Sequence, residues 1–337
     1  MSPCSQGGGP GGMALPSTAI NIASTSSLSS TQNEDLKAAI FQRLHPRVYL
    51  ERFLAENVRP DGRLEEEWRD IDINVGSIST ANGSALIRSG KTTIVCGVKA
   101  EIAEPELDHP NEGFLVPNID LPAICSSKFK PGPPSEEAQI LSERLNDVLV
   151  GSGMLPLSSL CIHPGKSVWV LYVDATCINY DGNAFDAAVL AMVSALRDTL
   201  LPQATYDEIT GRTICSPPTS KSKPGVRLQL DESRLPIGLS FGLFGGKHVI
   251  ADPTSFEEPL LDTSISVVID GRGKLSSVNQ VGVGVLTSDE EDMEVDSSQQ
   301  KHTTTTSRDD ALLKCIALAK KRHQVVRECV YTVGNSS

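Results

Sequence analysis

The sequence Asp-Gly-Asn-Ala-Phe-Asp at residues 181–186, directly before the apolar run of residues 187–193, is the most informative part of the chain. With the strand pattern of residues 168–180 in front of it, this stretch predicts a strand, a glycine turn and a helix. The N-terminus of a helix is a place where an anion-binding loop can sit. Phosphate capture there calls for small residues, a hydroxyl and an Arg. This loop instead carries the bulky Phe185 and the anion Asp186, which would repel phosphate.

Composition limits the class of protein. With 337 residues, the chain is long enough for one large domain or two lobes. It has 39% hydrophobic but 4% aromatic residues, so we expect a core of Val, Ile, Leu and Ala. The net charge of −12 argues against a wholly basic surface for nucleic acid. Six acids lie within residues 289–296, so the rest of the chain is closer to neutral and leaves room for a local basic path for RNA.

The cysteines and the N-terminal segment indicate a compartment. Eight cysteines are scattered without a Cys-x-x-Cys pair, and several, such as Cys96, lie inside apolar patterns. Reduced core thiols are therefore expected, which suggests the cytosol or nucleus. No apolar stretch approaches membrane-spanning length. Residues 1–33 contain no charged residue and are rich in Ser, Thr and Gly, which predicts a disordered tail and not an Arg-rich transit peptide.

The spacing of apolar residues predicts an α+β order of elements. Helices are predicted over residues 36–44, from Pro46 onward, and over residues 136–150, 187–201 and 309–330. Strands are predicted over residues 71–75, 85–88, 92–98, 168–180, 227–230, 238–244, 248–251, 265–269 and 275–281. Residues 104–134, rich in Pro, Asn and Asp, are expected to form a long excursion. The elements divide into two similar lobes.

The sequence does not support three other kinds of site: a P-loop, a zinc site and the nucleophile elbow of a serine hydrolase. Gly90-Lys91-Thr92 is not the end of a P-loop, because the first Gly of that motif would fall on Ala85 and the segment leads into a strand. Cys161 and His163 have no second Cys/His cluster at zinc spacing, and the six His are dispersed. No Gly-x-Ser-x-Gly elbow is present. We therefore expect no metal and no cofactor.

Several strings in the sequence resemble the RNase PH family of phosphorolytic exoribonucleases, and most closely the non-catalytic ring subunits of the eukaryotic RNA exosome. They are Arg-Pro-Asp-Gly-Arg at residues 59–63, Asn-Val-Gly-Ser-Ile-Ser-Thr-Ala-Asn-Gly-Ser-Ala at 74–85, Cys-Gly-Val-Lys-Ala-Glu at 96–101, Val-Pro-Asn-Ile-Asp-Leu-Pro at 116–122 and Tyr-Asp-Gly-Asn at 180–183.

The resemblance implies the RNase PH fold, two βαβα-like lobes packed as one domain. We expect the first lobe over residues 58–205 and the second over residues 206–287. The remaining segments are a tail at 1–33, helices at 34–57, an acidic and Ser/Thr-rich disordered linker at 288–307 and a helix at 308–332.

The resemblance also implies that the chemistry of an active relative has been lost at two places. In active relatives, paired aspartates precede a strand that resembles residues 265–269; here Glu258 replaces one of them and Ser264 the other. Asp262 stands two positions from Ser264, roughly 6–7 Å along an extended chain. The charge pattern alone favours a solvated acidic turn at residues 257–262. The second loss is the phosphate loop, occupied by Asn183, Ala184, Phe185 and Asp186. We therefore expect no catalytic residue and no enzyme.

A basic loop is the candidate RNA contact. Lys128 and Lys130 flank Phe129 in a Pro- and Gly-containing loop, a combination that suits the phosphates and bases of single-stranded RNA. The resemblance implies that this loop faces the pore of a ring and that Arg144 matches one arginine of a family pair, while Asp147 reverses the charge of the other. A mobile surface loop without RNA remains the alternative interpretation of the same residues.

The resemblance thus implies a structural subunit of the exosome ring. Such a subunit would sit among other RNase PH-like subunits and cap proteins in the nucleus, nucleolus and cytoplasm. RNA threaded through the ring would reach a separate nuclease for 3′-to-5′ processing and decay, in rRNA maturation and mRNA turnover. Two alternatives stay open: an active phosphate-dependent 3′-to-5′ exoribonuclease with Glu258 or Asp262 as acid, and a free-standing RNA-binding adaptor. Phe185-Asp186 disfavours the first, and apolar strand edges disfavour a monomeric adaptor.

Overall fold

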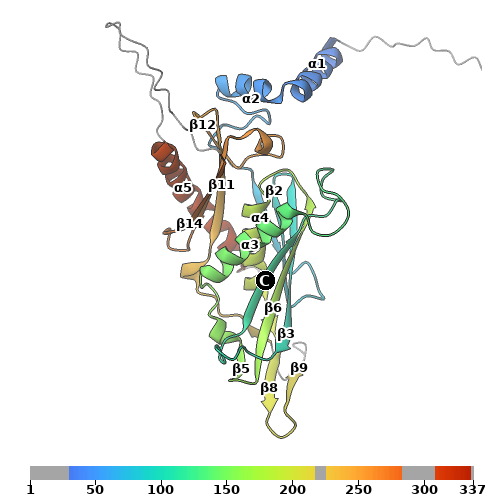
Figure 1. Ribbon diagram of the computed structural model, residues 1–337, viewed down its shortest axis with the longest axis vertical. Helices are drawn as coiled ribbons and strands as arrows, with labels where there is room; N and C mark the ends of the chain where they lie inside the picture. Colours follow the sequence, from blue (N-terminus) through green and yellow to red (C-terminus); the bar gives the residue numbers. More distant parts are fainter. Residues whose placement is uncertain (1–29, 217–224, 283–307, 335–337) are drawn as a thin grey trace, which may run out of the picture. The chain divides into compact units, whose positions relative to one another are not determined.

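The computed structural model describes residues 30–216, 225–282 and 308–334 (Figure 1). Most of the predicted tail and the predicted acidic linker lie outside these ranges. The chain divides into two compact units, Met1–Tyr49 and Leu50–Ser337. Helix α1 (Ser30–Leu44) belongs to the first unit, where the ring of Phe41 lies 5.7 Å from that of His45. Helix α2 (Pro46–Ala55) begins at the predicted proline, which is favourable at the first helical position because it needs no donor there.

The first sheet is built from four predicted strands and two unpredicted ones, β4 (Phe114–Asp120) and the short β5 (Cys161–His163). Its order is β1 (Ile71–Val75), β2 (Gly83–Ser89), β3 (Thr92–Ala103), β6 (Ser167–Asn179) and β4, with β5 paired to β6. All pairs are antiparallel except β4 with β6.

The expectation of a long excursion over residues 104–134 was therefore wrong, because this segment contains β4. Residues Leu115, Pro117 and Ile119 are buried at alternate positions of β4. A proline in a strand argues against a strand assignment from sequence, although it is tolerated at the edge of a sheet, where β4 lies.

The second sheet is a four-stranded antiparallel sheet. Its order is β12 (His248–Ala251), β11 (Ile237–Phe244), β13 (Thr263–Ile269) and β14 (Leu275–Gly282). Two small pairs lie outside it, namely β7 (Leu200–Leu201) with β10 (Val226–Arg227) and β8 (Gln203–Asp207) with β9 (Arg212–Ser216). The β8–β9 hairpin was not predicted, and the strand expected over residues 227–230 is reduced to β10.

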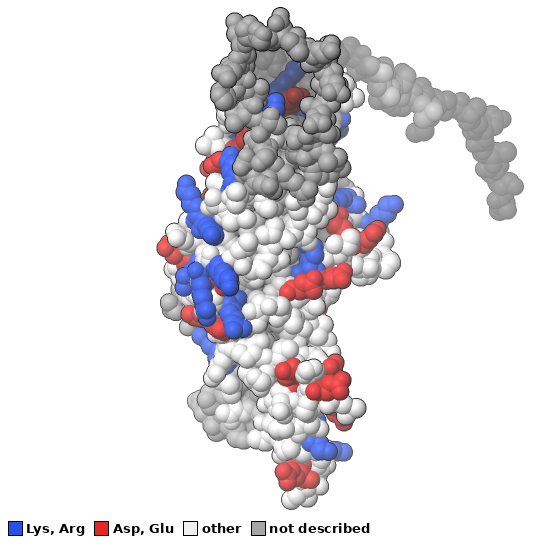
Figure 2. All heavy atoms as spheres, turned by 60° about the vertical axis from the view of Figure 1, so that its left-hand side comes forward, with Lys and Arg blue, Asp and Glu red and all other residues white. Residues whose placement is uncertain are grey.

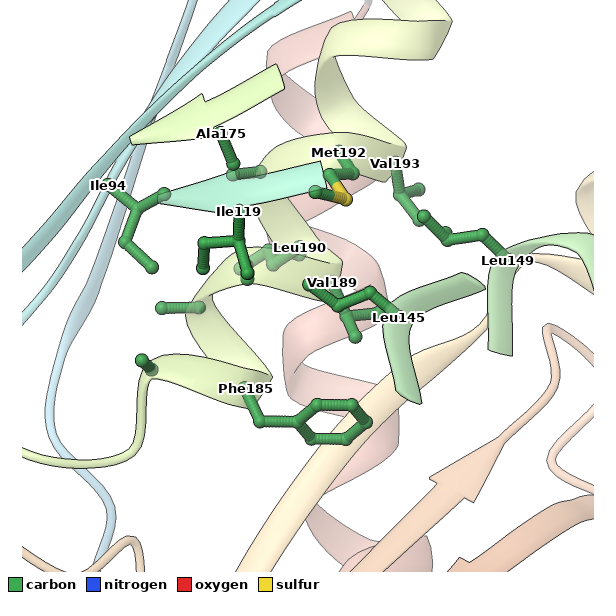
Figure 3. Close-up of a cluster of buried hydrophobic side chains, with 14 of the residues drawn as sticks. Ile94, Ile119, Leu145, Leu149, Ala175, Phe185, Val189, Leu190, Met192 and Val193 are labelled. Atoms are coloured by element: carbon green, nitrogen blue, oxygen red, sulfur yellow. The ribbon is translucent and has the colours of Figure 1, made fainter. Parts of the chain in front are cut away.

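Helix α4 (Ala184–Asp198) joins the two sheets. It contacts β2, β3 and β6 of the first sheet and β11 of the second, and it also touches α3 (Glu136–Gly151) and α5 (Arg308–Gly334). Figure 3 shows Met192 of α4 near Ile119 and Ala175 of the first sheet, and Val193 and Val189 beside Leu149 and Leu145 of α3. The helix begins three residues before the predicted start at residue 187 and ends before Thr199, since residues 200–201 form β7. Its burial between two sheets explains why it is apolar on nearly every side.

Candidate functional site

Most of the candidate residues line a single cleft of about 860 Å³. Its walls come from α3 and the segment before it, from the turn and first residues of α4, and from β11, β13 and the segment before β13. The structure brings together seven of the residues singled out in the sequence: Lys128, Arg144, Asn183, Ala184, Phe185, Glu258 and Ser264. Lys130 and Asp186 are not among the residues that line it. Lys130 is exposed on its loop, and Asp186 turns towards β11.

The turn before α4 is held in a conformation that few residues adopt. Gly182 has a φ of +80° and Asn183 a φ of +51°, both in the left-handed region that favours glycine and, less strongly, asparagine. A Cβ on Gly182 would lie 2.5 Å from the backbone N of Ser255. The glycine therefore allows this turn to approach the segment that precedes Glu258.

Glu258 occupies the donors at this turn. The backbone N–H of Asn183 donates a 2.7 Å hydrogen bond to Oε1 of Glu258, and the hydroxyl of Tyr180 donates a 2.5 Å bond to Oε2. Burial raises the pKa of Glu258, whereas these hydrogen bonds and the charge of Lys128 oppose the rise. Burial and the Glu258 charge also raise the pKa of the Tyr180 hydroxyl, which therefore stays protonated. An internal carboxylate thus binds at the helix N-terminus, where an external anion would otherwise be favoured.

Asp186 faces away from the cleft. Ser240 donates to it from its backbone N–H at 2.7 Å and from its hydroxyl at 2.8 Å, and the side-chain amide of Asn183 donates at 2.7 Å. Burial raises the pKa of Asp186 to about 6, and the neighbouring Asp252 contributes to the rise. The direct repulsion of phosphate inferred from the sequence is therefore not the geometry observed, because this carboxylate binds to β11.

Phe185 fills the space beside the loop. Figure 3 shows its ring extending from the first turn of α4 beside Leu145 of α3. The guanidinium of Arg144 lies over the ring at 4.3 Å from the ring centre, a cation–π contact. Gly238 of β11 leaves room for the ring, since a Cβ there would come within 3.2 Å of it. Burial lowers the pKa of Arg144, and the charge of Asp186 acts in the opposite direction.

The acidic segment is not the solvated turn expected from its charge pattern. The Glu257 side chain is 1% exposed and pairs with the fully buried Arg59, whose Nε donates to it at 2.9 Å. Asp262 accepts a 2.6 Å hydrogen bond from the backbone N–H of Gly245. Ser264 is exposed on β13. The charge pattern did not predict the burial of Glu257 because its ion-pair partner, Arg59, lies 198 residues away in the sequence.

A cluster of buried arginines supports the cleft, and sequence reasoning missed its role. Arg69 donates to both carboxylate oxygens of Asp252, at 2.8 and 2.6 Å, and to the carbonyls of Asp181 and Gly182, at 2.7 and 3.2 Å. These hydrogen bonds and charges hold the pKa of Asp252 at about 2 despite burial. Arg59 in turn donates to the carbonyls of Ala251 and Asp252. The string at residues 59–63 signalled the family, but nothing in it identifies these partners.

The basic loop is less basic than its sequence indicates. Lys128 forms a 2.8 Å ion pair with Glu137 and lies 5.5 Å from the centre of the Phe129 ring and 5.4 Å from that of Tyr180. The Phe129 ring is buried against Tyr180, edge to face at 5.3 Å. Phe129 is therefore unavailable for base stacking in this conformation. On the face shown in Figure 2, Lys and Arg side chains gather locally and acids lie in several separate groups.

Metal binding and membrane insertion find no support in the part of the chain that the structure describes. There, no group of three or more His, Cys, Asp or Glu side chains could hold a metal ion. No helix in the same ranges is long and apolar enough to cross a membrane.

Comparison with protein-family models gives two matches along the chain. Residues 67–202 match the model described as 3′ exoribonuclease family, domain 1, and residues 234–294 match domain 2 of the same family.

Comparison with known proteins points the same way. The chain is 44% identical to "Exosome complex component rrp43" of Schizosaccharomyces pombe, over 72% of this chain and 87% of that protein. It is 38% identical to "Exosome complex component Rrp42" of Methanothermobacter thermautotrophicus, over 69% and 82%. A solved structure, "archaeoglobus fulgidus exosome with RNA bound to the active site", superimposes with a TM-score of 0.67 at 26% identity, covering 87% of this chain and 99% of that one.

Proposed function

The chain belongs to the 3′ exoribonuclease (RNase PH) family, and we propose that it is a non-catalytic subunit of an exosome ring. Its relatives are exosome components over most of their length, and its fold matches an exosome core subunit. Its ring partners are other RNase PH-like subunits and cap proteins. The assignment to the rrp43 type among sibling subunits, the part in rRNA maturation and mRNA turnover, and residence in the nucleus, nucleolus and cytoplasm all belong to this proposal.

The hydrogen bond from Asn183 to Glu258 carries the proposal that the subunit is inactive. A phosphorolytic site needs an open anion position and an acid that can reach the leaving RNA end. Here one carboxylate lies at the α4 N-terminus and Ser264 stands where the resemblance implies a second acid. The Phe185 ring and Arg144 occupy the adjacent wall. A carboxylate already bonded to two protein donors is poorly placed to serve as the acid of the alternative exoribonuclease.

The loop that carries Lys128 and Lys130 is the proposed contact for RNA in the ring. Lys130 is exposed, and Lys128 is half exposed although paired with Glu137. Arg144 lies on the wall of the cleft, so it would contact only RNA that enters the cleft. Such contacts with phosphates would be electrostatic and independent of sequence.

A phosphorolysis assay tests the proposal. The chain, purified with its ring partners, is incubated with single-stranded RNA, phosphate and magnesium, and nucleoside diphosphates are measured. Because a partner could be active, the comparison is between the complex with the natural chain and one that carries Glu258→Gln. We expect identical rates. A rate that falls with Glu258→Gln, while assembly is intact, would establish the active alternative.

Assembly is tested separately by co-purification and size-exclusion chromatography. The isolated chain is expected to self-associate, and co-expression with RNase PH-like partners should yield a defined complex. A stable monomer that ignores those partners would favour the free-standing adaptor.

A further inference from the structure

The charges that line the cleft do not suit a polyanion. Three carboxylates, Glu136, Glu137 and Glu258, face two cations, Lys128 and Arg144. Lys128 is already paired with Glu137. Arg144 lies against the ring of Phe185, and its charge acts on Asp186. The wall therefore carries a net negative charge, which disfavours the close approach of phosphate groups.

Glu258 is the partly buried carboxylate of this cleft, whereas the other unpaired acid, Glu136, is exposed. Within the described ranges, no Lys, Arg or His lies at ion-pair distance from its carboxylate, which accepts hydrogen bonds from two neutral donors. The external charges that act on it come from Lys128 and Glu137, which are paired with each other. An ionised carboxylate offers about four acceptor positions, so two remain for a further donor. A partly buried carboxylate of this kind gains most from a cation that arrives with a ligand.

Apolar side chains surround this charge. Ile140 of α3, which is 52% exposed, lines the cleft together with Leu261 and Pro259, close in sequence to Glu258. The volume of about 860 Å³ falls within the roughly 300–1,000 Å³ of typical ligand pockets. The combination of apolar walls and a partly buried carboxylate without an ion-pair partner matches a short peptide better than a nucleotide.

We propose that this cleft binds a short segment of a partner protein through an arginine that pairs with Glu258 and apolar neighbours that pack against Ile140 and Pro259. Arginine fits best because its planar guanidinium bonds a carboxylate through two donors. The proposal goes beyond membership of the ring and does not depend on it.

Defined probes test this assignment. The full chain in its co-purified complex is titrated with acetyl-Leu-Arg-Leu-amide, with the same peptide carrying citrulline for Arg, and with oligouridylate, and binding is followed by saturation-transfer NMR. Citrulline keeps the shape of Arg but lacks its charge. Because hydrogen bonds to charged groups contribute about 1.5–3 kcal/mol, the Arg peptide should bind about tenfold or more tightly than the citrulline peptide.

Matched variants locate the site. Glu258→Gln keeps an acceptor for Asn183 and should abolish the preference for Arg. Glu143 is exposed on α3, the helix of Ile140, and is not part of the cleft lining, so Glu143→Gln should leave the preference intact. Ile140→Ser should weaken both peptides alike, which keeps the test informative if Glu258→Gln assembles poorly. Equal binding of the two peptides, no saturable binding, or oligouridylate binding that displaces the Arg peptide would each overturn the proposal; the last would identify the cleft as an RNA site.

Discussion

Asn183 and Glu258 lie 75 residues apart and meet through a 2.7 Å hydrogen bond at the N-terminus of α4. The first lobe supplies the N–H group and the second lobe supplies the carboxylate. A negative group is stabilised there by the helix dipole. The bond therefore ties the lobes together at the position where the resemblance implies a phosphate loop.

Removing this carboxylate should destabilise the chain. Glu258→Ala leaves the Asn183 N–H and the Tyr180 hydroxyl without their acceptor, at a cost of about 1–3 kcal/mol. Glu258→Gln should cost less because an acceptor remains. Denaturant unfolding of the complex measures the difference, with the exposed Glu143→Ala as control. An Ala variant as stable as the natural chain would show that the bond does not tie the lobes.

The buried pair of Arg59 and Glu257 should be sensitive to the loss of one partner. Arg59→Met leaves the Glu257 carboxylate buried without its cation, at a cost of about 3–5 kcal/mol. The double substitution Arg59→Met with Glu257→Leu removes both charges and should recover part of that loss. Denaturant unfolding compares the stabilities of the single and double variants, with the exposed Arg88→Ala as control. A double variant no more stable than the single one would argue against the charge as the cause.

Asp186 should make stability depend on pH. Its pKa is raised from 3.8 to about 6, so the folded state binds more protons than the unfolded state between these values. Stability contributed by this group therefore falls as pH rises from about 4 to 6 and stays lower above it. Asp186→Asn can keep all three hydrogen bonds if its NH₂ donates to the Ser240 hydroxyl.

The variant should be about 2–3 kcal/mol more stable at pH 8 and close to the natural chain at pH 4. Thermal unfolding at both pH values checks this. A difference that does not change with pH would contradict the assigned cause.

The close approach at Gly182 should not tolerate a side chain. Gly182→Ala would strain a φ of +80° and place a Cβ 2.5 Å from backbone atoms of Thr254 and Ser255. We expect a loss of more than about 2 kcal/mol, since the left-handed conformation alone costs about 1–2 kcal/mol. Gly165→Ala is the matched control because Gly165 has a φ of +69° and no atom within 4 Å of an added Cβ. Equal losses in the two variants would assign the whole effect to backbone strain.

The basic loop should contribute to RNA contact in the assembled ring. Lys130→Ala should weaken RNA crosslinking more than Lys128→Ala, because Glu137 partly offsets the charge of Lys128. Removing one lysine–phosphate interaction should lower the salt slope by about 0.7 for single-stranded RNA. Arg144→Ala should act in the same direction but weakly. Unchanged crosslinking and salt slope in the triple substitution would leave the subunit as a scaffold that does not touch RNA.

Local patterns were enough for most elements of the fold. The period of two at residues 71–75 and the apolar run before residue 201 each corresponded to an element of the expected type. Strand β4 was missed because Pro117 hides its alternation and its partner β6 begins 47 residues after β4 ends.

The arrangement of the site depends on hydrogen-bond and ion-pair partners that are distant in sequence. Asn183, Phe185 and Glu258 could be singled out from the resemblance, but their arrangement could not. The sequence predicted that the Asp186 carboxylate faces the loop, whereas in the structure it accepts hydrogen bonds from Ser240. Glu257 looked solvated because Arg59 is remote in sequence.

The arginine cluster also bears on the order in which the chain is made. Arg69 leaves the ribosome 183 residues before Asp252, its buried partner. At about 5–20 residues per second, this interval lasts roughly 10–40 s. During it the nascent first lobe holds the Arg69 guanidinium without the Asp252 carboxylate to which it donates in the folded chain. The turn before α4, which Arg69 also contacts, can therefore complete its hydrogen bonding only after the second lobe has been made.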